Sequence, residues 1–498
     1  MQDVIRAGRY LARLAELTEW SLLAQLWLVA LRIARLVARF RGDPLSPAGM
    51  ARFEEELKRL LDEMGRLIMQ WALNGLESKS RTDMPSVIFW ERDAYRPKRL
   101  SSMRNLNCLF GPIRVSRWLY EPLDGLSLPA LFPLERCLGI VAGVATPTLA
   151  DLVARLSVDF TQRQVLETLR QQCHVVWGPA TLRRVTKAMA QGIAPFQHAA
   201  RVQMLLGWLK QATQGGGPVR PTLAVGRDGL MLPIRGKETY KEGATATVSV
   251  LDRCGQRLGT IYLGQMPESG QGTLSDELTR LLRDVLAQWQ GALPRLVYIT
   301  DAGFHPRDYF ENVLSRMLDP KRAGHYLDWE WTVDYYHACC YVSKVAEAIF
   351  GPGREAHSWA AKMRRWLKEK PGGIHRVLRS AGALRTIRGL VGEHKDYQNA
   401  YAFLQKHAPW MDYAGRRRRK LPIGSGVTEA ACKIVFSQRF KCSGMKWDIA
   451  GGAAILELRV AVLSRTWAAV RDAMFASLAP TLPRTHGQIR SIPPANAA

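Results

Sequence analysis

The hydrophobic positions at the start of the chain recur at helical spacing. Leu11, Leu14 and Leu17 open a pattern over residues 4–41 in which arginines lie between the apolar positions. This pattern predicts an amphipathic helix whose arginine-bearing face either is solvated or contacts DNA. Prolines then break the pattern, and a second helix is expected over residues 47–76.

The following region is predicted to change from strands to helices. Short apolar runs at 87–90, 108–111 and 113–120 predict strands. Residues 149–193 predict three short helices, the last of which begins at Pro179 after a glycine turn. This arrangement fits a helix-turn-helix that enters a DNA major groove, although an ordinary helical hairpin has the same pattern. The cations expected to contact DNA from the last helix are Arg183, Arg184 and Lys187.

A sheet is expected after the glycine-rich linker at residues 215–218. Apolar runs predict strands at 222–228, 246–251, 258–263, 296–301 and 329–333. Amphipathic patterns predict helices at 273–289, at 306–317 and from Tyr335 onward. Three strands, helix, strand, helix, strand, helix is the element order of an RNase H-like domain.

The fold class expected is therefore multidomain α/β, because a chain of 498 residues is too long for one core. Helical patterns between the fifth strand and the C-terminal helices predict an insertion in the sheet domain. The predicted regions are an N-terminal helical region (1–80), a small β element with the helix-turn-helix-like helices (81–214), an RNase H-like mixed-sheet domain (215–342 and 412–475), its helical insertion (343–411) and a disordered tail (476–498).

The net charge of the chain indicates which class of partner it binds. The chain holds 70 Lys and Arg against 44 Asp and Glu, which leaves a net charge of +26. A protein this basic attracts a polyanion, because each neutralised phosphate releases condensed counterions. A ribosome-like or simply soluble basic protein has the same composition, so charge alone does not identify DNA.

Neither a membrane anchor nor a disulfide scaffold is expected. Residues 21–31 and 137–150 are uncharged but too short to span a bilayer. Arginines recur near the N-terminus, where a signal peptide would be apolar, so we expect a soluble cytoplasmic protein. The eight cysteines form no Cys-x-x-Cys pair, so most are expected to be buried, inert thiols.

Three carboxylates lie at the ends of predicted elements. Asp228 ends the first strand of the sheet, Asp301 ends the fourth, and Glu429 lies at the start of a C-terminal helix. Taken singly, each could belong to a turn or a helix cap. Taken together, they predict a site for two Mg²⁺ ions, with Mn²⁺ as a possible substitute, because phosphodiester chemistry uses paired divalent ions held by carboxylate oxygens.

From about residue 87 to residue 467, the chain resembles the DDE transposases of bacterial insertion sequences, in particular the Kra-type and Lre-type groups. The segments that carry the resemblance are Asp228-Gly229, Ile299-Thr-Asp301, Asp334-Tyr-Tyr-His337, Gly424-Ser-Gly-Val-Thr-Glu429 and Arg439-Phe-Lys-Cys-Ser-Gly-Met-Lys-Trp447. One departure is visible after Tyr120, where Glu121-Pro-Leu-Asp replaces an expected Cys-x-x-Cys metal knuckle.

The resemblance implies that Asp228, Asp301 and Glu429 bind the metal ions. The preference for Glu429 over another helix carboxylate, such as Glu457, comes from the resemblance. The resemblance also implies that the protein cleaves the inverted-repeat ends of a mobile DNA element and joins the freed 3′-OH to target DNA. A dimer or larger assembly on DNA, in the nucleoid-associated cytoplasm of a bacterium, is expected.

Two further sets of residues follow from the motifs. Asp334 and His337 resemble an Asp-x-x-His element near the scissile phosphate, although His337 could equally be structural. Cations around Glu429 are expected to hold DNA phosphates, although such runs are also typical of a solvated face or a flexible loop. They are Arg416, Arg417, Arg418, Arg419, Lys420, Arg439, Lys441 and Lys446.

Two other functions use the same features. A domesticated, catalytically silent relative would keep the DNA-binding surface but not strand transfer. An RNase H-like nuclease would share the metal site and would not join strands. Inverted repeats flanking the gene would favour the transposase over both.

Overall fold

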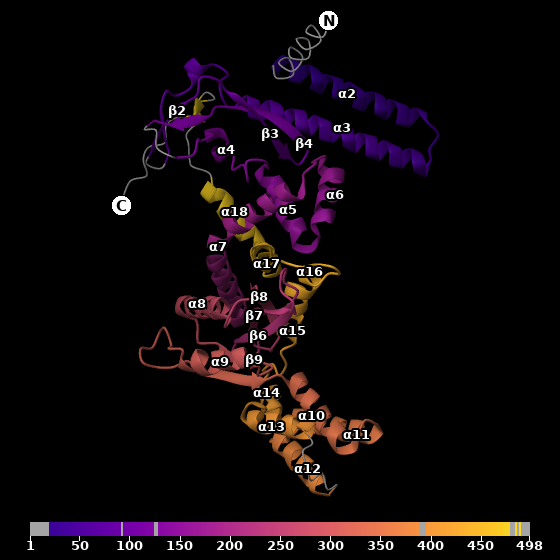
Figure 1. Cartoon of the computed structure of the whole chain (residues 1–498), viewed down its shortest axis with the longest axis vertical. Coiled ribbons are helices and arrows are strands. Elements are labelled where there is room, and N and C mark those ends of the chain that lie inside the picture. The colour runs from indigo at the N-terminus through magenta and orange to yellow at the C-terminus, as the bar shows by residue number, and fades with distance from the viewer. Residues whose placement is uncertain are drawn as a thin grey trace. The chain divides into compact units, whose positions relative to one another are not determined.

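Two units of mixed helix and strand make up the protein (Figure 1). The computed structural model describes residues 19–90, 93–123, 128–387, 395–478, 484–485 and 488–489. The N-terminal unit comprises Met1–Gly192 with Arg471–Ala498, and the sheet unit comprises Ile193–Val470. The predicted multidomain α/β class is confirmed at this level.

The described part of the N-terminal unit begins with a helical hairpin, α2 (Glu19–Gly42) and α3 (Pro47–Asn74). Ser46 caps α3, since its Oγ accepts the Gly49 N–H at 3.0 Å. The two helices pack through Leu22, Val29, Leu36, Leu60 and Leu67. The second predicted helix is confirmed, and the first is confirmed from residue 19 onward. Residues 4–18 lie outside the described part of the chain.

One segment among the described residues, Ser21–Gly42 in α2, is long and apolar enough to cross a membrane by length and composition. The prediction that residues 21–31 form too short a stretch is corrected, because the apolar character continues past Arg32. A helix of a water-soluble protein and a signal sequence meet the same criterion. In this structure, one stripe of α2 packs on α3.

Small sheets follow the hairpin in the N-terminal unit. Strands β1, β2 and β5 pair in the order β1-β2-β5, and β3 pairs with β4. Their bounds are β1 (Ile88–Trp90), β2 (Asp93–Pro97), β3 (Ser102–Cys108), β4 (Gly111–Arg117) and β5 (Tyr120–Pro122), preceded by the short helix η1 (Arg81–Asp83). Residues 108–111, predicted as a strand, instead form the β3–β4 turn, where Gly111 has φ of 119°.

The three predicted helices after this region are confirmed, but the last is much longer than expected. After α4 (Pro133–Cys137), they are α5 (Pro147–Asp159), α6 (Gln162–Cys173) and α7 (Pro179–Gln214). α7 continues through Pro195, and its C-terminal half belongs to the sheet unit. Val202, Leu205 and Leu209 lie in the same core as the sheet strands. The predicted domain boundary at residue 214 is therefore too late, because apolar packing divides α7 near residue 192.

The sheet unit contains one five-stranded mixed sheet in the order β10-β9-β6-β7-β8. β6 pairs in parallel with β9 and β9 with β10, whereas β7 is antiparallel to both β6 and β8. The strands are β6 (Thr222–Leu232), β7 (Lys241–Leu251), β8 (Arg257–Gln265), β9 (Arg295–Thr300) and β10 (Trp329–Val333). All five predicted strands are confirmed, and the fifth has the predicted bounds.

Helices before and between these strands supply much of the main core. α8 (Gly272–Gln288) follows β8, and α9 (Phe304–Asn312) with the short helix η2 (Leu314–Arg316) follows β9. Leucines of α8 such as Leu278 and Leu282 share a core with Val225 and Leu296 of the central strands. The N-cap residue of α8, Gln271, makes no side-chain capping hydrogen bond. Instead, Thr273 donates to the carboxylate of Glu268 through its N–H (2.8 Å) and its hydroxyl (2.7 Å).

The region predicted to be a helical insertion is helical in the residues that the structure describes. It consists of α10 (Tyr335–Phe350), α11 (Arg354–Glu369), α12 (Gly373–Ile387), α13 (Lys395–His407) and η3 (Ala408–Trp410). Figure 1 shows α10 to α13 gathered in one helical lobe. Residues 388–394 lie outside the description.

After α13 and η3, a series of short and long helices leads the chain back to the sheet and continues to Leu478. They are α14 (Tyr413–Arg418), α15 (Gly426–Ala431), the π-helix η4 (Cys432–Ser437), α16 (Gln438–Phe440), α17 (Ile449–Leu463) and α18 (Trp467–Leu478). The predicted tail is not wholly without structure, since β11 (Arg484–Thr485) pairs with β12 (Gln488–Ile489). The rest of residues 479–498 lies outside the described part.

The division of α7 between two cores gives the first testable prediction. Leu205→Ala should destabilise the sheet unit by about 3 kcal/mol, because it leaves a cavity beneath the strands. Hydrogen exchange should then accelerate in β6 and β9. Leu182→Ala, which alters an equally buried leucine in the other half of the helix, should instead accelerate exchange in α5 and α6. The same exchange pattern from both variants would contradict the division.

Candidate functional site

Asp228 and Asp301 lie close together because β6 and β9 are neighbouring parallel strands. The register pairs Gly226 with Ile299, and each aspartate follows its paired residue by two positions. Both side chains line one cleft of about 300 Å³, together with Gly303 and other residues at the start of α9. The structure thus brings together two of the three predicted carboxylates at the same sheet edge.

Glu429 is brought toward this pair by a close approach of α15 to the sheet. A Cβ at Gly226 would clash with the Thr428 hydroxyl, so only glycine fits beneath α15 at this point. The same hydroxyl hydrogen-bonds to Thr247 of β7 at 2.8 Å. Glu429, the next residue, has its Oε1 at 3.4 Å from the hydroxyl of Ser425, which donates to it.

The three carboxylates influence one another electrostatically. The pKa of Asp228 is raised from its ordinary value of 3.8 to about 6, mainly by burial and in smaller part by the negative charges of Asp301 and Glu429. Two hydrogen bonds act in the opposite direction, from the Cys432 thiol (3.3 Å) and from the Gly229 N–H (2.8 Å). Perturbed, clustered carboxylates in a cleft are typical of functional sites.

Cys432 is a site residue that the sequence did not reveal. It was expected to be a buried, inert thiol, and it is buried, but its Sγ donates to Asp228 Oδ2. Burial and the nearby carboxylates raise the pKa of this thiol, so it remains protonated and able to donate. Cys432 opens the π-helix η4, a rare element that is often found at functional sites. Its only sequence signal was its place three residues after Glu429.

A fourth carboxylate, Glu242, was also missed. It lies on β7 near Gly229 and lines the cleft with Asp228 and Asp301, whereas Glu429 is not among the cleft-lining residues. Glu429, in turn, is close enough to raise the pKa of Asp228. Glu429 and Glu242 are therefore both candidates for the third carboxylate of the site.

The fit of these residues to divalent ions is partial. Their carboxylate oxygens are the ligands that Mg²⁺ and Mn²⁺ prefer. The pKa of Asp228 is raised mainly by burial and in smaller part by Asp301 and Glu429, whose negative charges a cation would neutralise. Within residues 19–90, 93–123, 128–387 and 395–478, however, no three His, Cys, Asp or Glu side chains converge closely enough to hold an ion. The residue types therefore suit a divalent ion, but Glu429 or Glu242 would have to move closer to Asp228 and Asp301 to complete the set of ligands.

Asp334 is a structural residue that joins three segments near the site. Its buried carboxylate accepts the N–H of His337 (2.6 Å), which caps α10, and also accepts the N–H of Ser425. Its own N–H donates to the Thr300 carbonyl at 2.7 Å. Asp334 therefore positions the loop before Glu429 rather than reaching into the cleft.

His337 does not accompany Asp334 toward the cleft. Its ring packs edge-on against Tyr341 and Phe403, at centroid distances of 5.3 and 5.7 Å. It is not among the described residues that line the cleft. This geometry favours the structural alternative for His337, and a role near a scissile phosphate stays a prediction.

The cations around Glu429 divide into buried and exposed groups. Arg416 is buried and paired with Glu330 at 3.4 Å, so the prediction that it contacts DNA is corrected. Arg439 is also buried and lies over the Trp447 ring, so the same correction applies. Arg419 is exposed but pairs with Glu330 at 2.8 Å. The exposed cations that could reach a phosphate are Arg417, Arg418, Lys420, Lys441 and Lys446.

The predicted cations of the N-terminal unit share one exposed face of α7. Arg183, Arg184 and Lys187 are exposed, whereas the intervening Leu182 and Val185 are buried. Arg183 donates to Gln162 of α6 at 3.4 Å, which ties the two helices together. This arrangement is compatible both with helix-turn-helix binding and with an ordinary hairpin.

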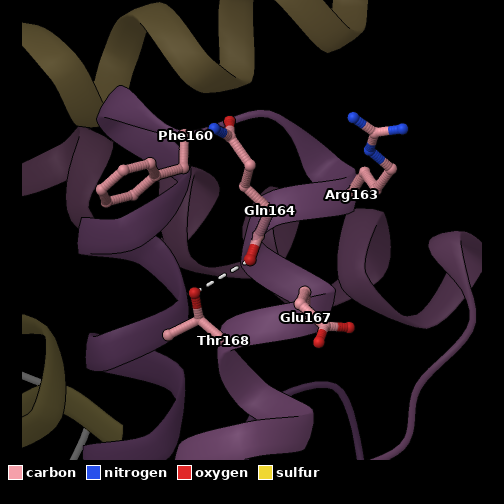
Figure 2. Close-up of a pocket in the computed structure, with 5 residues that line it drawn as sticks. All are labelled: Phe160, Arg163, Gln164, Glu167 and Thr168. Carbon is pink, nitrogen blue, oxygen red and sulfur yellow. Dashed lines mark hydrogen bonds between the residues drawn. The ribbon is translucent and has the colours of Figure 1, made fainter.

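A hollow on α6 provides a contrast with the sheet cleft. It is lined by Phe160, Arg163, Gln164, Glu167 and Thr168, and Figure 2 shows Thr168 bonded to the Gln164 main-chain oxygen (2.9 Å). Its single carboxylate, Glu167, is held by Arg170 at 2.6 Å. This hollow therefore lacks the clustered carboxylates that distinguish the sheet cleft.

The pKa of Asp228 predicts a stability effect with a defined pH dependence. Because the folded state holds the proton more tightly than the unfolded chain, the favourable contribution exists at low pH and is lost as pH rises through about 6. Asp228→Asn, which cannot ionise, should therefore stabilise the sheet unit by about 2 kcal/mol at about pH 8 and much less at about pH 4.5. Denaturant unfolding at both pH values measures the difference.

The control for this prediction is Asp308→Asn, which alters an exposed aspartate of α9. It should leave the unfolding free energy nearly unchanged at both pH values. Destabilisation by Asp228→Asn at about pH 8 would contradict the assignment of a raised pKa.

Asp334 predicts a second stability effect. Asp334→Ala should lower the free energy of unfolding by about 3 kcal/mol, because it removes a helix cap and leaves the buried Ser425 N–H without its acceptor. Asp412→Ala is the matched control, since it removes an exposed cap whose carboxylate accepts the Gly415 N–H at 3.0 Å. The control should cost about 1 kcal/mol. Equal decreases in the free energy of unfolding for the two variants would contradict a special role for Asp334.

Comparison with known proteins does not add a family: no family model matches the chain, and no curated protein matches it. The resemblance to transposases therefore rests on the quoted motifs.

Proposed function

We propose that this protein is a DNA transposase of the DDE class, in which an RNase H-like domain cleaves and joins DNA strands with divalent ions. The observation that carries the proposal is the meeting of Asp228 and Asp301 just beyond the last paired residues of the neighbouring parallel strands β6 and β9, with Glu429 close enough to raise the pKa of Asp228. Clustered carboxylates in a basic protein suit chemistry on phosphodiesters.

The topology supports the RNase H-like assignment. Three antiparallel strands, β6 to β8, come first, and β9 and β10 then add in parallel beside β6. Helices follow β8, β9 and β10, as the predicted element order requires. The helical lobe α10–α13 lies between β10 and α15, so an insertion separates the second and third proposed metal ligands.

Some residues of the site would bind the metal ions, and others would bind DNA. Asp228, Asp301 and Glu429 would hold two Mg²⁺ or Mn²⁺ ions, which when bound activate the attacking oxygen and stabilise the leaving oxygen. Cys432 and Gly229 orient the Asp228 carboxylate by donating to it. The exposed cations Lys441 and Lys446 would hold phosphates of the DNA backbone.

The expected partners are the element's terminal repeats and target DNA. Arg183, Arg184 and Lys187 on the exposed face of α7 would contact the repeats. Paired ends require two active sites, so we propose a dimer or larger assembly on DNA.

The proposal predicts metal-dependent cleavage of DNA taken from the flanks of the gene. Wild-type protein should cut with Mg²⁺ and not with EDTA, and Asp301→Asn should lose at least about 100-fold in rate, since even outer-shell changes at metal sites cost 10–100-fold. Glu429→Gln should lose as much, whereas Glu242→Gln should lose less than about tenfold. Asp308→Asn, which alters an exposed aspartate, should cut normally.

Each other outcome has a definite meaning. A large loss in Glu242→Gln with normal cutting by Glu429→Gln would make Glu242 the third ligand. Cutting without joining would favour a nuclease, and specific binding without cutting by wild type would favour a silent DNA-binding relative. Normal cutting by Asp301→Asn would contradict the proposed site.

A further inference from the structure

Phe304 is exposed at the edge of the cleft that contains Asp228 and Asp301. It is the first residue of α9, lines that cleft, and has 79% of its surface accessible. A single exposed apolar side chain needs no explanation in itself. A large aromatic ring beside the proposed reacting phosphate, however, is in a position to contact a nucleotide.

The backbone around Phe304 is fixed by local contacts. Asp301 Oδ1 accepts the Gly303 N–H at 2.9 Å, and Ala302 between them has φ of 65°, in the left-handed region. One turn further on, the Tyr298 hydroxyl donates to the Pro306 carbonyl at 2.9 Å. These contacts hold the start of α9, so the ring is presented from a rigid support.

His305 pairs with Phe304 and leads into a second hollow. The two rings meet edge-on, with centroids 5.2 Å apart and planes at 77°. His305, Glu242 and Gln271 line both the carboxylate cleft and the second hollow of about 380 Å³. The side chain of Gln271 is itself anchored, because its Oε1 accepts from the buried Arg227 at 3.2 Å. The shared residues make the two hollows one groove.

The far part of this groove is lined by two lysines, and an exposed aromatic residue that is not itself a lining residue is next to one of them in the chain. Lys237 and Lys241 line it and are exposed. Next to Lys241, Tyr240 has 54% of its surface accessible, and Lys441 Nζ lies 5.9 Å from its ring centroid. Of the two glutamates that line the hollow, Glu268 is engaged by Thr273. Exposed cations interleaved with aromatic rings suit a nucleic-acid strand.

We propose that this groove binds one unpaired nucleotide of the DNA next to the scissile phosphate. Phe304 stacks on the base, and Lys237 and Lys241 contact the adjoining phosphates. A paired base in a duplex does not offer its face, so the site selects an unpaired end or an extruded base. Stacking is tolerant of sequence, because every base has an aromatic face. This inference rests on the proposed function, since it takes DNA as the substrate.

The test is a binding measurement in EDTA, so that cleavage plays no part. The probes are a synthetic duplex with a short 3′ overhang, carrying 2-aminopurine at its first unpaired position, and the same duplex with a blunt end. Phe304→Ala should weaken binding of the overhang duplex about tenfold and of the blunt duplex less than about twofold. It should also abolish the quenching of 2-aminopurine fluorescence, which Phe304→Trp should retain.

The lysines give an independent expectation. The double variant Lys237→Gln/Lys241→Gln should weaken binding of both duplexes and make the affinity less dependent on salt, because phosphate contacts release counterions. Tyr326→Ala is the matched control, since Tyr326 is an aromatic of the same unit that has 63% of its surface accessible and lines neither hollow. It should bind both duplexes normally.

Two results would overturn the nucleotide site. They are unchanged binding of the overhang duplex by Phe304→Ala, and equal weakening of both duplexes by this variant. These failures are separate from failure of the proposed function. A protein that cuts DNA but shows no dependence on Phe304 contradicts only the nucleotide site. A protein that shows the Phe304-dependent binding but never cuts DNA contradicts only the transposase proposal.

Discussion

The parallel pairing of β6 with β9 is the constraint on which the proposed site depends. It sets Asp228 and Asp301 at the same level of the sheet edge, where burial and mutual repulsion make two negative charges costly. The protein offsets this cost only in part, through the Cys432 thiol and the Gly229 N–H. A cation would stabilise a site that is unfavourable when it holds only carboxylates. The raised pKa of Asp228 is therefore the central observation in favour of a metal site.

The third carboxylate is positioned by contacts from different parts of the chain. Thr428 lies against Gly226 of the central strand, and Asp334 at the end of β10 accepts the Ser425 N–H. Both contacts act within a few residues of Glu429. The short helix α15 is thus held from two sides, whereas a six-residue helix would have little stability alone. Packing of the insertion that begins at α10 is therefore coupled to the site through Asp334.

Much of the fold could be predicted from local pattern, because strands in a buried sheet are continuous apolar runs. Residues 329–333 are one such run, and β10 has these bounds. The length of α7 could not be predicted, since packing of its C-terminal half on the sheet core carries the helix through Pro195 to Gln214. Asp228 and Asp301 were identified because each ends an apolar run; Asp301 does follow β9, whereas β6 continues past Asp228 to Leu232. Burial of Arg416 could not be predicted, because nothing in the basic run 416–420 indicates its long-range partner Glu330. Glu242 was missed because only the pairing of β7 with β6 brings it beside Gly229.

Localised oxidative cleavage of the backbone would test the central claim most directly. Fe²⁺ with ascorbate generates radicals at a bound-metal site, and mass spectrometry locates the cuts whether or not the protein acts on DNA. The account predicts Mg²⁺-competed cuts beside Asp228, Asp301 and Glu429, all lost in Asp228→Asn. Cuts elsewhere in the chain, or cuts that Mg²⁺ and Asp228→Asn leave unchanged, would contradict a metal site at the edge formed by β6 and β9.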